Sequence, residues 1–196
     1  PRGLRFLLPD DVCVCRNCLE NLRPQFIRFK HKNISCLSLF YYDQNVQSLI
    51  YKYKGCGDIE LCVSFISYFS PYLRLLFKGY FLVPAPSSKE KILERGFNHV
   101  KLMFKPLKKP YINCLRKNKD HKQSDHNMKE RKNVKNVIEF VDGKSVKGKK
   151  ILLVDDIYTT GSTVDACIRL LKSNGAKRIK VLTIAKTREL DDREYR

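Results

Sequence analysis

The chain has 196 residues, of which 43% are hydrophobic, so it has enough apolar surface to fold and is not an intrinsically disordered protein. It carries 39 lysine and arginine residues against 20 aspartate and glutamate residues, which makes the net charge +19. Such a charge is typical either of a solvated basic surface or of a protein that binds an anion, such as nucleic acid or a phosphorylated substrate.

The sequence also argues against a membrane span and against a secreted fold. The most apolar long stretch, residues 61–81, is interrupted by serines, a proline and basic residues, whereas a span needs roughly 18–20 apolar residues in a row. No secretory signal pattern opens the chain, and its eight cysteines do not form a dense disulfide framework. We therefore expect a cytoplasmic protein without membrane insertion, in which Cys62, Cys114 and Cys167 are reduced core thiols.

The first half of the chain predicts alternating strands and helices after a basic, cysteine-bearing segment at residues 1–33. In chain order we expect a strand over 34–42, a helix over 45–53, a helix over 59–77 that bends near Pro71, a strand over 79–86, and a helix from Ser87 or Ser88 to about Phe104, broken near Gly96.

The second half predicts a polar stretch followed by a strand–loop–helix–strand unit. In chain order we expect a short strand over 111–115, a polar and mobile stretch over 116–135, a brief strand over 137–141, a basic turn over 144–150, a strand over 151–154, a helix from Ser162 or Thr163 that Gly175 ends, a strand over 179–185 and a charged tail. The uniformly apolar run at 151–154 indicates a strand that is covered on both faces, so this unit predicts an α/β fold with a parallel sheet.

Residues 151–163, ILLVDDIYTTGST, place two acids at the carboxyl end of this buried strand. Ligands of open parallel sheets bind at that end, and the following loop leads into a helix N-terminus, whose free N–H groups attract anions. Gly161 permits a close approach of the backbone to a phosphate. Ionised Asp155 and Asp156 only accept hydrogen bonds, so ligand hydroxyls or a metal ion suit them. A sugar phosphate satisfies both ends of this segment.

The same thirteen residues resemble the phosphoribosyl-pyrophosphate (PRPP) motif of type I phosphoribosyltransferases: four apolar residues, two acids, two larger residues and a T-T-G-x-T loop. The resemblance implies that Asp155 and Asp156 are the catalytic pair and hold the ribose 2′- and 3′-hydroxyls. It implies that the 5′-phosphate binds to the loop of Thr159, Thr160, Gly161, Ser162 and Thr163. It also implies a Mg²⁺ ion that the pyrophosphate of PRPP carries. An acid cap on a purely structural loop is the alternative.

Further motifs resemble the ComF branch of these proteins, also called GntX-like, over residues 13 to about 187. Residues 82–89 read LVPAPSSK and residues 94–98 read ERGFN, which is similar to the V-P-x-P and R-G-F-N segments of that branch. Two weaker segments follow its order: 51–55, similar to K-[FY]-x-G but followed by an apparent insertion at 56–57, and the series Gln123, Arg131, 133–134 and Phe140, similar to Q…R…N-V…F with altered spacing before the phenylalanine.

The ComF resemblance implies a binding loop for the pyrophosphate and a lid over the substrate. The pyrophosphate loop would consist of Pro84, Ala85, Pro86, Ser87 and Lys89, with Arg95 nearby. The polar stretch 116–135, with Lys122, Gln123 and Arg131, takes the place of the flexible loop that closes over the substrate in the transferases. The alternatives are a surface cation for Arg95 and a solvated charge run for the polar stretch.

The resemblance thus implies a type I phosphoribosyltransferase fold: an α/β structure with a parallel sheet flanked by helices, a small zinc-ribbon-like N-terminal appendage and a hood. We expect the N-terminal cysteine segment over 1–33, the phosphoribosyltransferase-like domain over 34–190 and a frayed tail over 191–196.

The N-terminal segment contains one C-x-x-C pair, Cys15 and Cys18, with Cys13 beside it. Two such pairs make a tetrahedral zinc site, and ComF-type proteins usually carry another pair upstream, so we expect the partner pair to precede Pro1. Cys13 and Cys36 are the other candidate ligands. A structural zinc ion is the preferred interpretation, and a turn with free thiols is the alternative.

Three functions are compatible with these motifs. The first is a ComF-type, PRPP-binding protein that serves natural competence and handles incoming single-stranded DNA, with a competence helicase as a possible partner. The second is an active phosphoribosyltransferase of nucleotide metabolism, and the third is a non-catalytic PRPP sensor. Some purine-specific relatives carry an acid at the position of Thr159, so purine salvage is not favoured. The sequence names neither an acceptor nor an oligomeric state.

Overall fold

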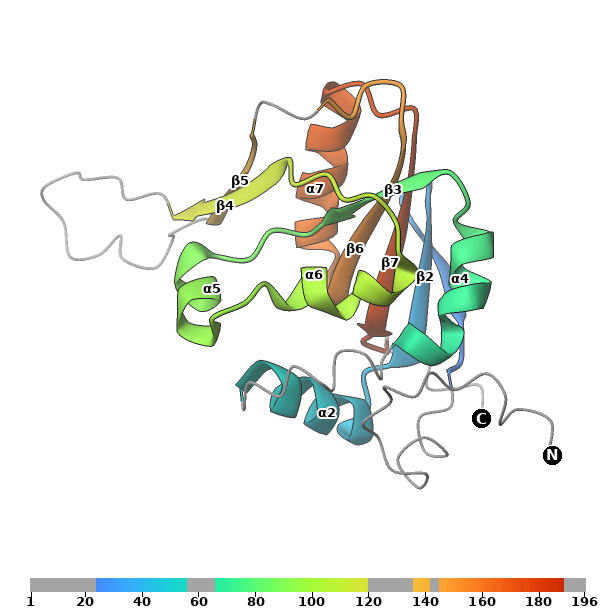
Figure 1. Cartoon of the computed structure of the whole chain (residues 1–196), viewed down its shortest axis with the longest axis vertical. Coiled ribbons are helices and arrows are strands. Elements are labelled where there is room, and N and C mark those ends of the chain that lie inside the picture. The colour runs from blue at the N-terminus through green and yellow to red at the C-terminus, as the bar shows by residue number, and fades with distance from the viewer. Residues whose placement is uncertain (1–23, 56–65, 120–135, 142–144, 189–196) are drawn as a thin grey trace, which may run out of the picture.

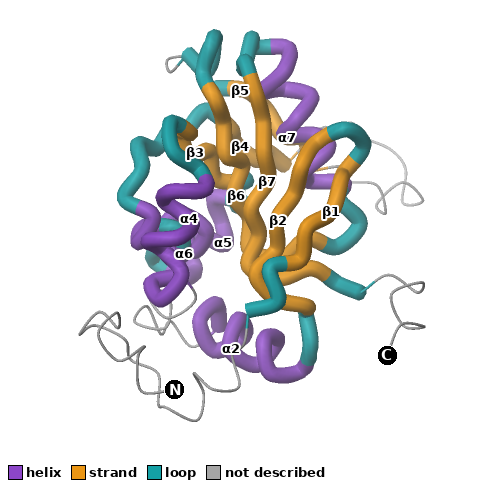
Figure 2. Tube along the Cα trace, turned by 90° about the vertical axis from the view of Figure 1, so that its right-hand side faces the viewer, coloured by secondary structure: helices purple, strands orange, loops and turns teal. Residues whose placement is uncertain are grey.

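The computed structural model describes residues 24–55, 66–119, 136–141 and 145–188. Within them lies a five-stranded sheet in the order β1–β2–β7–β6–β3 (Figures 1 and 2). The strands are β1 (Ile27–His31), β2 (Ile34–Tyr41), β3 (Tyr80–Pro84), β6 (Lys150–Tyr158) and β7 (Arg178–Lys186). The neighbours β2, β7, β6 and β3 are parallel, and β1 runs antiparallel to β2. The parallel sheet expected from the sequence is therefore confirmed.

The helices follow the expected order. They are α2 (Gln44–Gly55), η2 (Ser67–Phe69), α4 (Ser70–Leu76), α5 (Lys89–Arg95), α6 (His99–Met103), η3 (Lys105–Leu107) and α7 (Ser162–Ser173). Gly96, with a φ of 76°, ends α5, so the expected break there is confirmed. The helix expected over 59–77 is described only from residue 66 onward, where it is divided into η2 and α4, and Pro71 lies in the first turn of α4.

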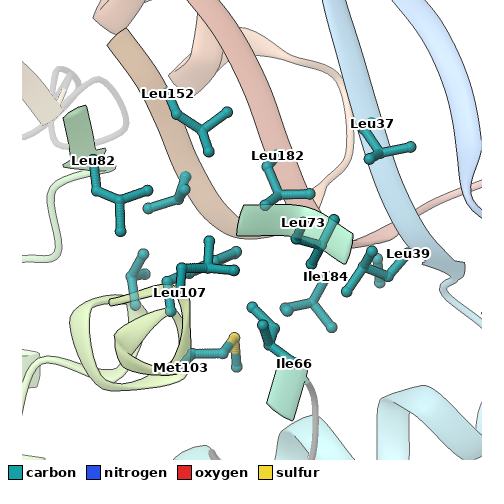
Figure 3. Close-up of a cluster of buried hydrophobic side chains, with 14 of the residues drawn as sticks. Leu37, Leu39, Ile66, Leu73, Leu82, Met103, Leu107, Leu152, Leu182 and Ile184 are labelled. Atoms are coloured by element: carbon teal, nitrogen blue, oxygen red, sulfur yellow. The ribbon is translucent and has the colours of Figure 1, made fainter. Parts of the chain in front are cut away.

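The sheet is covered on both faces, because successive residues of a strand point to opposite sides. Leu152 and Val154 of β6 join a core cluster with residues of α2, α4 and α6, part of which Figure 3 shows. Ile151 and Leu153 join a second cluster with the apolar face of α7. All four side chains are fully buried, which explains why this part of β6 is apolar at every position.

A hairpin of β4 (Leu115–Lys119) and β5 (Asn136–Phe140) forms a second, two-stranded sheet. The strand β5 agrees with the expected strand over 137–141. In contrast, β4 shows that two expectations were wrong. The strand expected over 111–115 begins only at Leu115, and the first residues of the polar stretch 116–135 belong to this strand. Leu115 pairs with Phe140, and both pack against the cluster beneath α7, so tertiary contacts order a segment whose composition indicates a loop.

Strand β1 lies within residues 1–33, which the sequence places in an N-terminal appendage. Its side chains alternate between half-buried Ile27, Phe29 and His31 and exposed Arg28 and Lys30, as expected for an edge strand. The strand was not predicted because its basic residues mask the alternation. Its pairing with β2 places residues 27–31 in the main sheet.

Several expectations concern residues outside the described part of the chain: the zinc candidates Cys13, Cys15 and Cys18, the thiol Cys62, the lid residues Lys122, Gln123 and Arg131, and the tail 191–196. Cys114 and Cys167 are buried free thiols, as expected. Among the described helices, none has the length and apolar character needed to cross a bilayer.

Candidate functional site

The acid pair lies inside β6, which continues to Tyr158 instead of ending at Val154. The strand continues because β7 pairs with it as far as Lys186. Asp155 and Asp156 are consecutive strand residues, so their side chains leave the strand on opposite faces. Asp156 points toward α2 and α6, where its partners lie.

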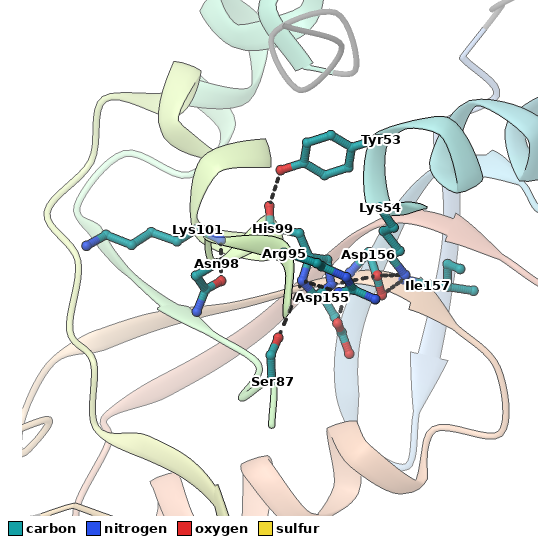
Figure 4. Close-up of polar contacts among 10 residues, drawn as sticks. All are labelled: Tyr53, Lys54, Ser87, Arg95, Asn98, His99, Lys101, Asp155, Asp156 and Ile157. Carbon is teal, nitrogen blue, oxygen red and sulfur yellow. Dashed lines mark hydrogen bonds and ion pairs between the residues drawn. The ribbon is translucent and has the colours of Figure 1, made fainter. Parts of the chain in front are cut away.

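Asp156 is 8% exposed and is surrounded by donors (Figure 4). Its Oδ2 accepts a hydrogen bond from His99 Nε2 at 3.0 Å and forms an ion pair with Lys54 Nζ. Its Oδ1 accepts a hydrogen bond from the Ile157 N–H at 2.6 Å. Burial favours a raised pKa for this carboxyl, but the hydrogen bond from His99 and the charge of Lys54 outweigh burial and hold the pKa of Asp156 well below its usual range. Asp156 is therefore a carboxylate at neutral pH.

Asp155 has the opposite environment. Its Oδ1 accepts the N–H of Asp156 at 2.9 Å. Burial, and after it the negative charge of Asp156, raise the pKa of Asp155 well above its usual range. The pair is therefore asymmetric: one carboxylate is held charged, and the other takes up a proton easily. Together they can accept hydrogen bonds from two neighbouring ligand hydroxyls.

The loop after β6 is shaped for an anion. Gly161 has a φ of 76°, and a Cβ there would lie 2.6 Å from the Tyr158 hydroxyl and 2.8 Å from His31 Cε1, so any other residue would strain the backbone and displace these side chains. As the N-cap residue of α7, it supplies no side-chain acceptor to the first turn. The exposed Thr160 and Ser162 lie at this turn, with their hydroxyl oxygens 2.9 Å apart. Free N–H groups, hydroxyls and the helix dipole together favour a phosphate here.

A pocket of about 420 Å³ opens between the acid pair and the loop after β3, and a small phosphorylated sugar fits a volume of this order. Its lining consists of Lys54, Ala85, Pro86, Ser87, Ser88, Glu90, Lys91, Arg95, His99, Lys117, Asp155, Asp156, Ile157 and Thr163. Basic side chains from α2, α5 and β4 thus share one pocket with the two acids.

The pocket brings together many of the residues expected from the sequence: Asp155, Asp156, Thr163, Ala85, Pro86, Ser87 and Arg95. Two others do not line it, since Pro84 is buried at the end of β3 and Lys89 is exposed on α5. The loop residues 159–162 also lie outside the lining, directly before Thr163 in the chain.

The sequence analysis did not predict three basic residues that line the pocket: Lys54, His99 and Lys117. Lys54 belongs to the segment YKYKG, and His99 directly follows ERGFN, so both stood beside motifs that were recognised. No spacing rule shows that either side chain reaches Asp156, because both contacts join residues that are far apart in the chain.

No group of three His, Cys, Asp or Glu side chains among the described residues could hold a metal ion. Both oxygens of Asp156 are already engaged. A Mg²⁺ ion therefore fits this pocket only as a partner of a ligand's phosphate oxygens, which is a common way for proteins to hold it. Cys36, one of the candidate zinc ligands, is a core residue of β2, and burial raises the pKa of its thiol to about 11.

Comparison with known proteins identifies the family. The model of the phosphoribosyl transferase domain family matches residues 92–195. Competence protein ComFC of Streptococcus pneumoniae is 33% identical, with 94% of this chain and 92% of that protein covered. The chain belongs to the ComFC family. Competence protein ComFC of Bacillus subtilis is 31% identical, with 85% of this chain and 70% of that protein covered. Among solved structures, the adenine phosphoribosyltransferase of Saccharomyces cerevisiae is 15% identical and covers 91% of this chain and 94% of its own, with a TM-score of 0.48.

Membership of the ComFC family confirms the expected fold class, an α/β structure of the type I phosphoribosyltransferase kind. The matched domain contains Arg95, His99, the acid pair and the anion loop, whereas Lys54 and the loop after β3 lie before it. The pocket of this ComFC-family chain is therefore built by the matched domain and by the residues that precede it.

Proposed function

We propose that the pocket binds PRPP together with Mg²⁺. The observation that carries this proposal is that the acid pair and the start of α7 border one pocket, whose other wall contains Ser87 and Arg95. The 5′-phosphate would bind at the N-terminus of α7, and the ribose hydroxyls would bind to the acid pair. The pyrophosphate would bind along residues 85–88 and to the guanidinium of Arg95, which suits phosphate oxygens.

This arrangement suits displacement of pyrophosphate from C1 of the ribose by an acceptor, through a state in which the ribose ring gains positive charge. The charged Asp156 would orient the ribose and oppose that charge, while Arg95 and Lys91 would attract the departing pyrophosphate. A bound Mg²⁺ would neutralise part of the charge on the pyrophosphate. A non-catalytic PRPP sensor of the ComFC family would use the same contacts, so turnover with a panel of bases and amines separates the two.

Calorimetric titration with PRPP and Mg²⁺ tests the proposal. Wild type should bind, and Asp155→Asn/Asp156→Asn should bind about 100-fold more weakly or not at all, because each hydrogen bond to a charged group contributes about 1.5–3 kcal/mol. Glu139→Gln is the matched control, since it removes an exposed carboxylate of β5 that does not line the pocket. No binding by folded wild type, or equal binding by the double variant, would refute the proposal.

A second candidate function, the handling of single-stranded DNA delivered by a competence helicase, is favoured by a basic edge at the other end of β6 and β7. Residues 145–150 and 172–180 contain no acid. Their turns are joined by hydrogen bonds from Gly148 N to Gly175 O at 2.8 Å and from Lys177 N to Lys149 O at 2.9 Å. Figure 1 shows both turns at the end of the sheet away from α2. The basic edge consists of Lys147, Lys149, Lys150, Lys172, Lys177, Arg178 and Lys180, and none of these forms an ion pair within the described chain.

Binding of fluorescent single-stranded DNA at several salt concentrations tests this second function. Lys177→Gln/Arg178→Gln should weaken binding and reduce the slope of log K against log salt by about 0.7 for each DNA phosphate that the variant no longer neutralises. Lys52→Gln/Lys105→Gln makes the same charge change at exposed positions of α2 and η3 and should leave the slope unchanged. Equal effects in both variants would show that net charge, and not the basic edge, is responsible.

We also place the protein in the cytoplasm, because Cys36, Cys114 and Cys167 are free thiols, which a reducing compartment preserves. A structural zinc ion at Cys15 and Cys18, with Cys13 nearby, rests on the sequence pattern alone. Metal analysis of the full-length protein tests it, and a zinc content near zero would refute it.

A further inference from the structure

The imidazole of His99 lies between Asp156 on one side and Arg95 and Ser87 on the other (Figure 4). The residue begins α6, and its side chain is 9% exposed. Its Nε2 lies 3.0 Å from Asp156 Oδ2 on the side of the acid pair. Its Nδ1 faces the proposed pyrophosphate wall, 3.2 Å from Arg95 Nη1 and 3.5 Å from Ser87 Oγ. One ring therefore connects Arg95 and Ser87 to Asp156.

The neighbours of the ring determine its protonation in the unliganded protein. An arginine guanidinium can only donate hydrogen bonds, so Nδ1 must accept from Arg95 through its lone pair. The proton of the neutral ring is then on Nε2, which donates to Asp156. A second proton on Nδ1 would point at the guanidinium and would add a third cation beside Arg95 and Lys54. This geometry therefore leaves no room for a proton on Nδ1 while the guanidinium of Arg95 lies beside it.

An anion on the pyrophosphate wall would change these conditions. Arg95 and Ser87 both line the pocket, and phosphate oxygens compete strongly for a guanidinium. Once Arg95 turns to the phosphate, Nδ1 loses its donor and faces a negative group. A proton on Nδ1 can then be donated to a phosphate oxygen, and imidazole is the side chain that most readily changes its charge near neutral pH.

We propose that His99 is a positioning residue that takes up a proton from solvent when a pyrophosphate group binds beside Arg95, and so couples that wall of the pocket to Asp156. The inference rests on the proposed binding of PRPP. Among the described residues, Asp156 from β6 and Arg95 from α5 contact the ring, Lys54 from α2 pairs with the same carboxylate, and Asp155 is the neighbour of Asp156 on the opposite face of β6. Glu90, Lys91 and Lys117 line the same pocket.

Proton uptake has two consequences. The imidazolium would lie between two negative groups, so it would fix Asp156 more firmly under the ribose while the pyrophosphate is bound. The proton returns to solvent when the pyrophosphate leaves. Binding of PRPP should therefore weaken as the pH rises, by up to about tenfold per pH unit if one full proton is taken up. Ribose 5-phosphate, which lacks the pyrophosphate, should not show this His99-dependent change.

Calorimetry in two buffers of different ionisation enthalpy counts the protons taken up per ligand. With PRPP and Mg²⁺ near pH 7, wild type should take up as much as about one proton more than His99→Gln. The glutamine amide can keep a donor for Asp156 but cannot be protonated, so this variant should fold and bind. Subtracting its value removes protons that belong to the ligand's own phosphates. Ribose 5-phosphate serves as the second control, with no difference expected.

Nitrogen-15 NMR of the histidine rings provides a readout that does not depend on the variant. In unliganded wild type, His99 should show a protonated Nε2 and an unprotonated Nδ1, and addition of PRPP with Mg²⁺ should protonate both. The opposite tautomer, a charged ring before ligand is added, or equal proton uptake by wild type and His99→Gln would overturn the coupling while leaving PRPP binding intact. Absence of PRPP binding by wild type would overturn the proposed function, and the coupling with it.

Discussion

At the residue scale, Asp155 and Asp156 are the same amino acid, but their side chains leave the strand on opposite faces and meet different surroundings. Asp156 points to Lys54 and His99, which hold it as a carboxylate even though it is buried. Burial and the charge of Asp156 act against the ionisation of Asp155, and the positive charge of Lys54 only partly offsets them. Asp156 is therefore held as a carboxylate, whereas the burial of Asp155 lowers the stability of the fold. Such a loss of stability is common in pockets that bind a ligand.

Single substitutions of the two acids should have opposite effects on stability. At pH 7, Asp156→Asn should lower the free energy of unfolding by about 2–3 kcal/mol, since it takes the negative charge away from Lys54 and His99 in a partly exposed pocket. Asp155→Asn should raise it by about 1 kcal/mol, because it removes a carboxyl group whose ionisation is disfavoured by burial and by the charge of Asp156. Urea denaturation of both variants measures these changes.

The two effects should also differ with pH. The pKa of Asp156 is lowered on folding, so its contribution is complete above the ordinary value of 3.8 and is lost as the pH falls toward the lower, folded value. The pKa of Asp155 is raised on folding, so its cost is complete above the raised value and disappears as the pH falls to 3.8. Equal effects of the two substitutions at pH 7 would contradict the asymmetry of the pair.

At the scale of elements, the turn from β6 into α7 has the most demanding geometry in the site. Gly161 combines a left-handed backbone with a close approach to Tyr158 and His31, which come from β6 and from the end of β1. The edge strand β1 therefore packs against the anion loop through its last residue, His31. Its contribution could not be read from the T-T-G-x-T pattern, which concerns only the loop itself.

Substitution of Gly161 separates the close approach from the backbone conformation. Gly161→Ala should cost about 2–3 kcal/mol and weaken binding of a phosphate ligand, because the new Cβ meets the Tyr158 hydroxyl at 2.6 Å in addition to the strained φ. Gly148→Ala is the matched control, with a φ of 72° and no atom within 4 Å of the new Cβ, so it should cost only about 1 kcal/mol. Thermal denaturation and phosphate-ligand titration of both variants compare them. Similar effects would show that the backbone conformation alone matters.

At the scale of the whole molecule, the sheet separates three environments. The pocket lies at the carboxyl ends of β3 and β6, and the basic edge lies at the amino ends of β6 and β7. The two core clusters cover the faces of the sheet. The described thiols belong to these cores. Burial is the main cause that raises the pKa of Cys36 and Cys114 to about 11 and of Cys167 to about 12.

Thiol labelling should report this global packing. In the native protein at pH 8, Cys36, Cys114 and Cys167 should react with iodoacetamide at least about 100-fold more slowly than in urea, because the thiol is both buried and almost fully protonated. Mass spectrometry of peptides measures each site separately. Cys167 lies on the buried face of α7, in the second core cluster. Rapid labelling of this thiol in the native protein would show that the cluster opens readily.

The sequence alone was enough to predict the helices and strands whose apolar residues recur at regular spacing, and the acidic and anion-binding character of residues 155–163. The four buried residues of α7, Val164, Cys167, Ile168 and Leu171, lie where the helical spacing places them, and β6 is buried on both faces as its apolar run indicates. Such features depend on neighbours in the chain, which local periodicity records. The strand β4 was hidden because its order comes from pairing with β5 and packing beneath α7.

Only the tertiary structure decided which side chains meet at the acid pair. Lys54 comes from α2 and His99 from α6, and neither spacing nor composition indicates that both reach Asp156. The joining of two basic turns into one edge has the same origin, since it depends on the parallel pairing of β6 with β7. Contacts between distant segments follow from the path of the folded chain, so the protonation states that control this pocket arise from the fold and cannot be read from the motif.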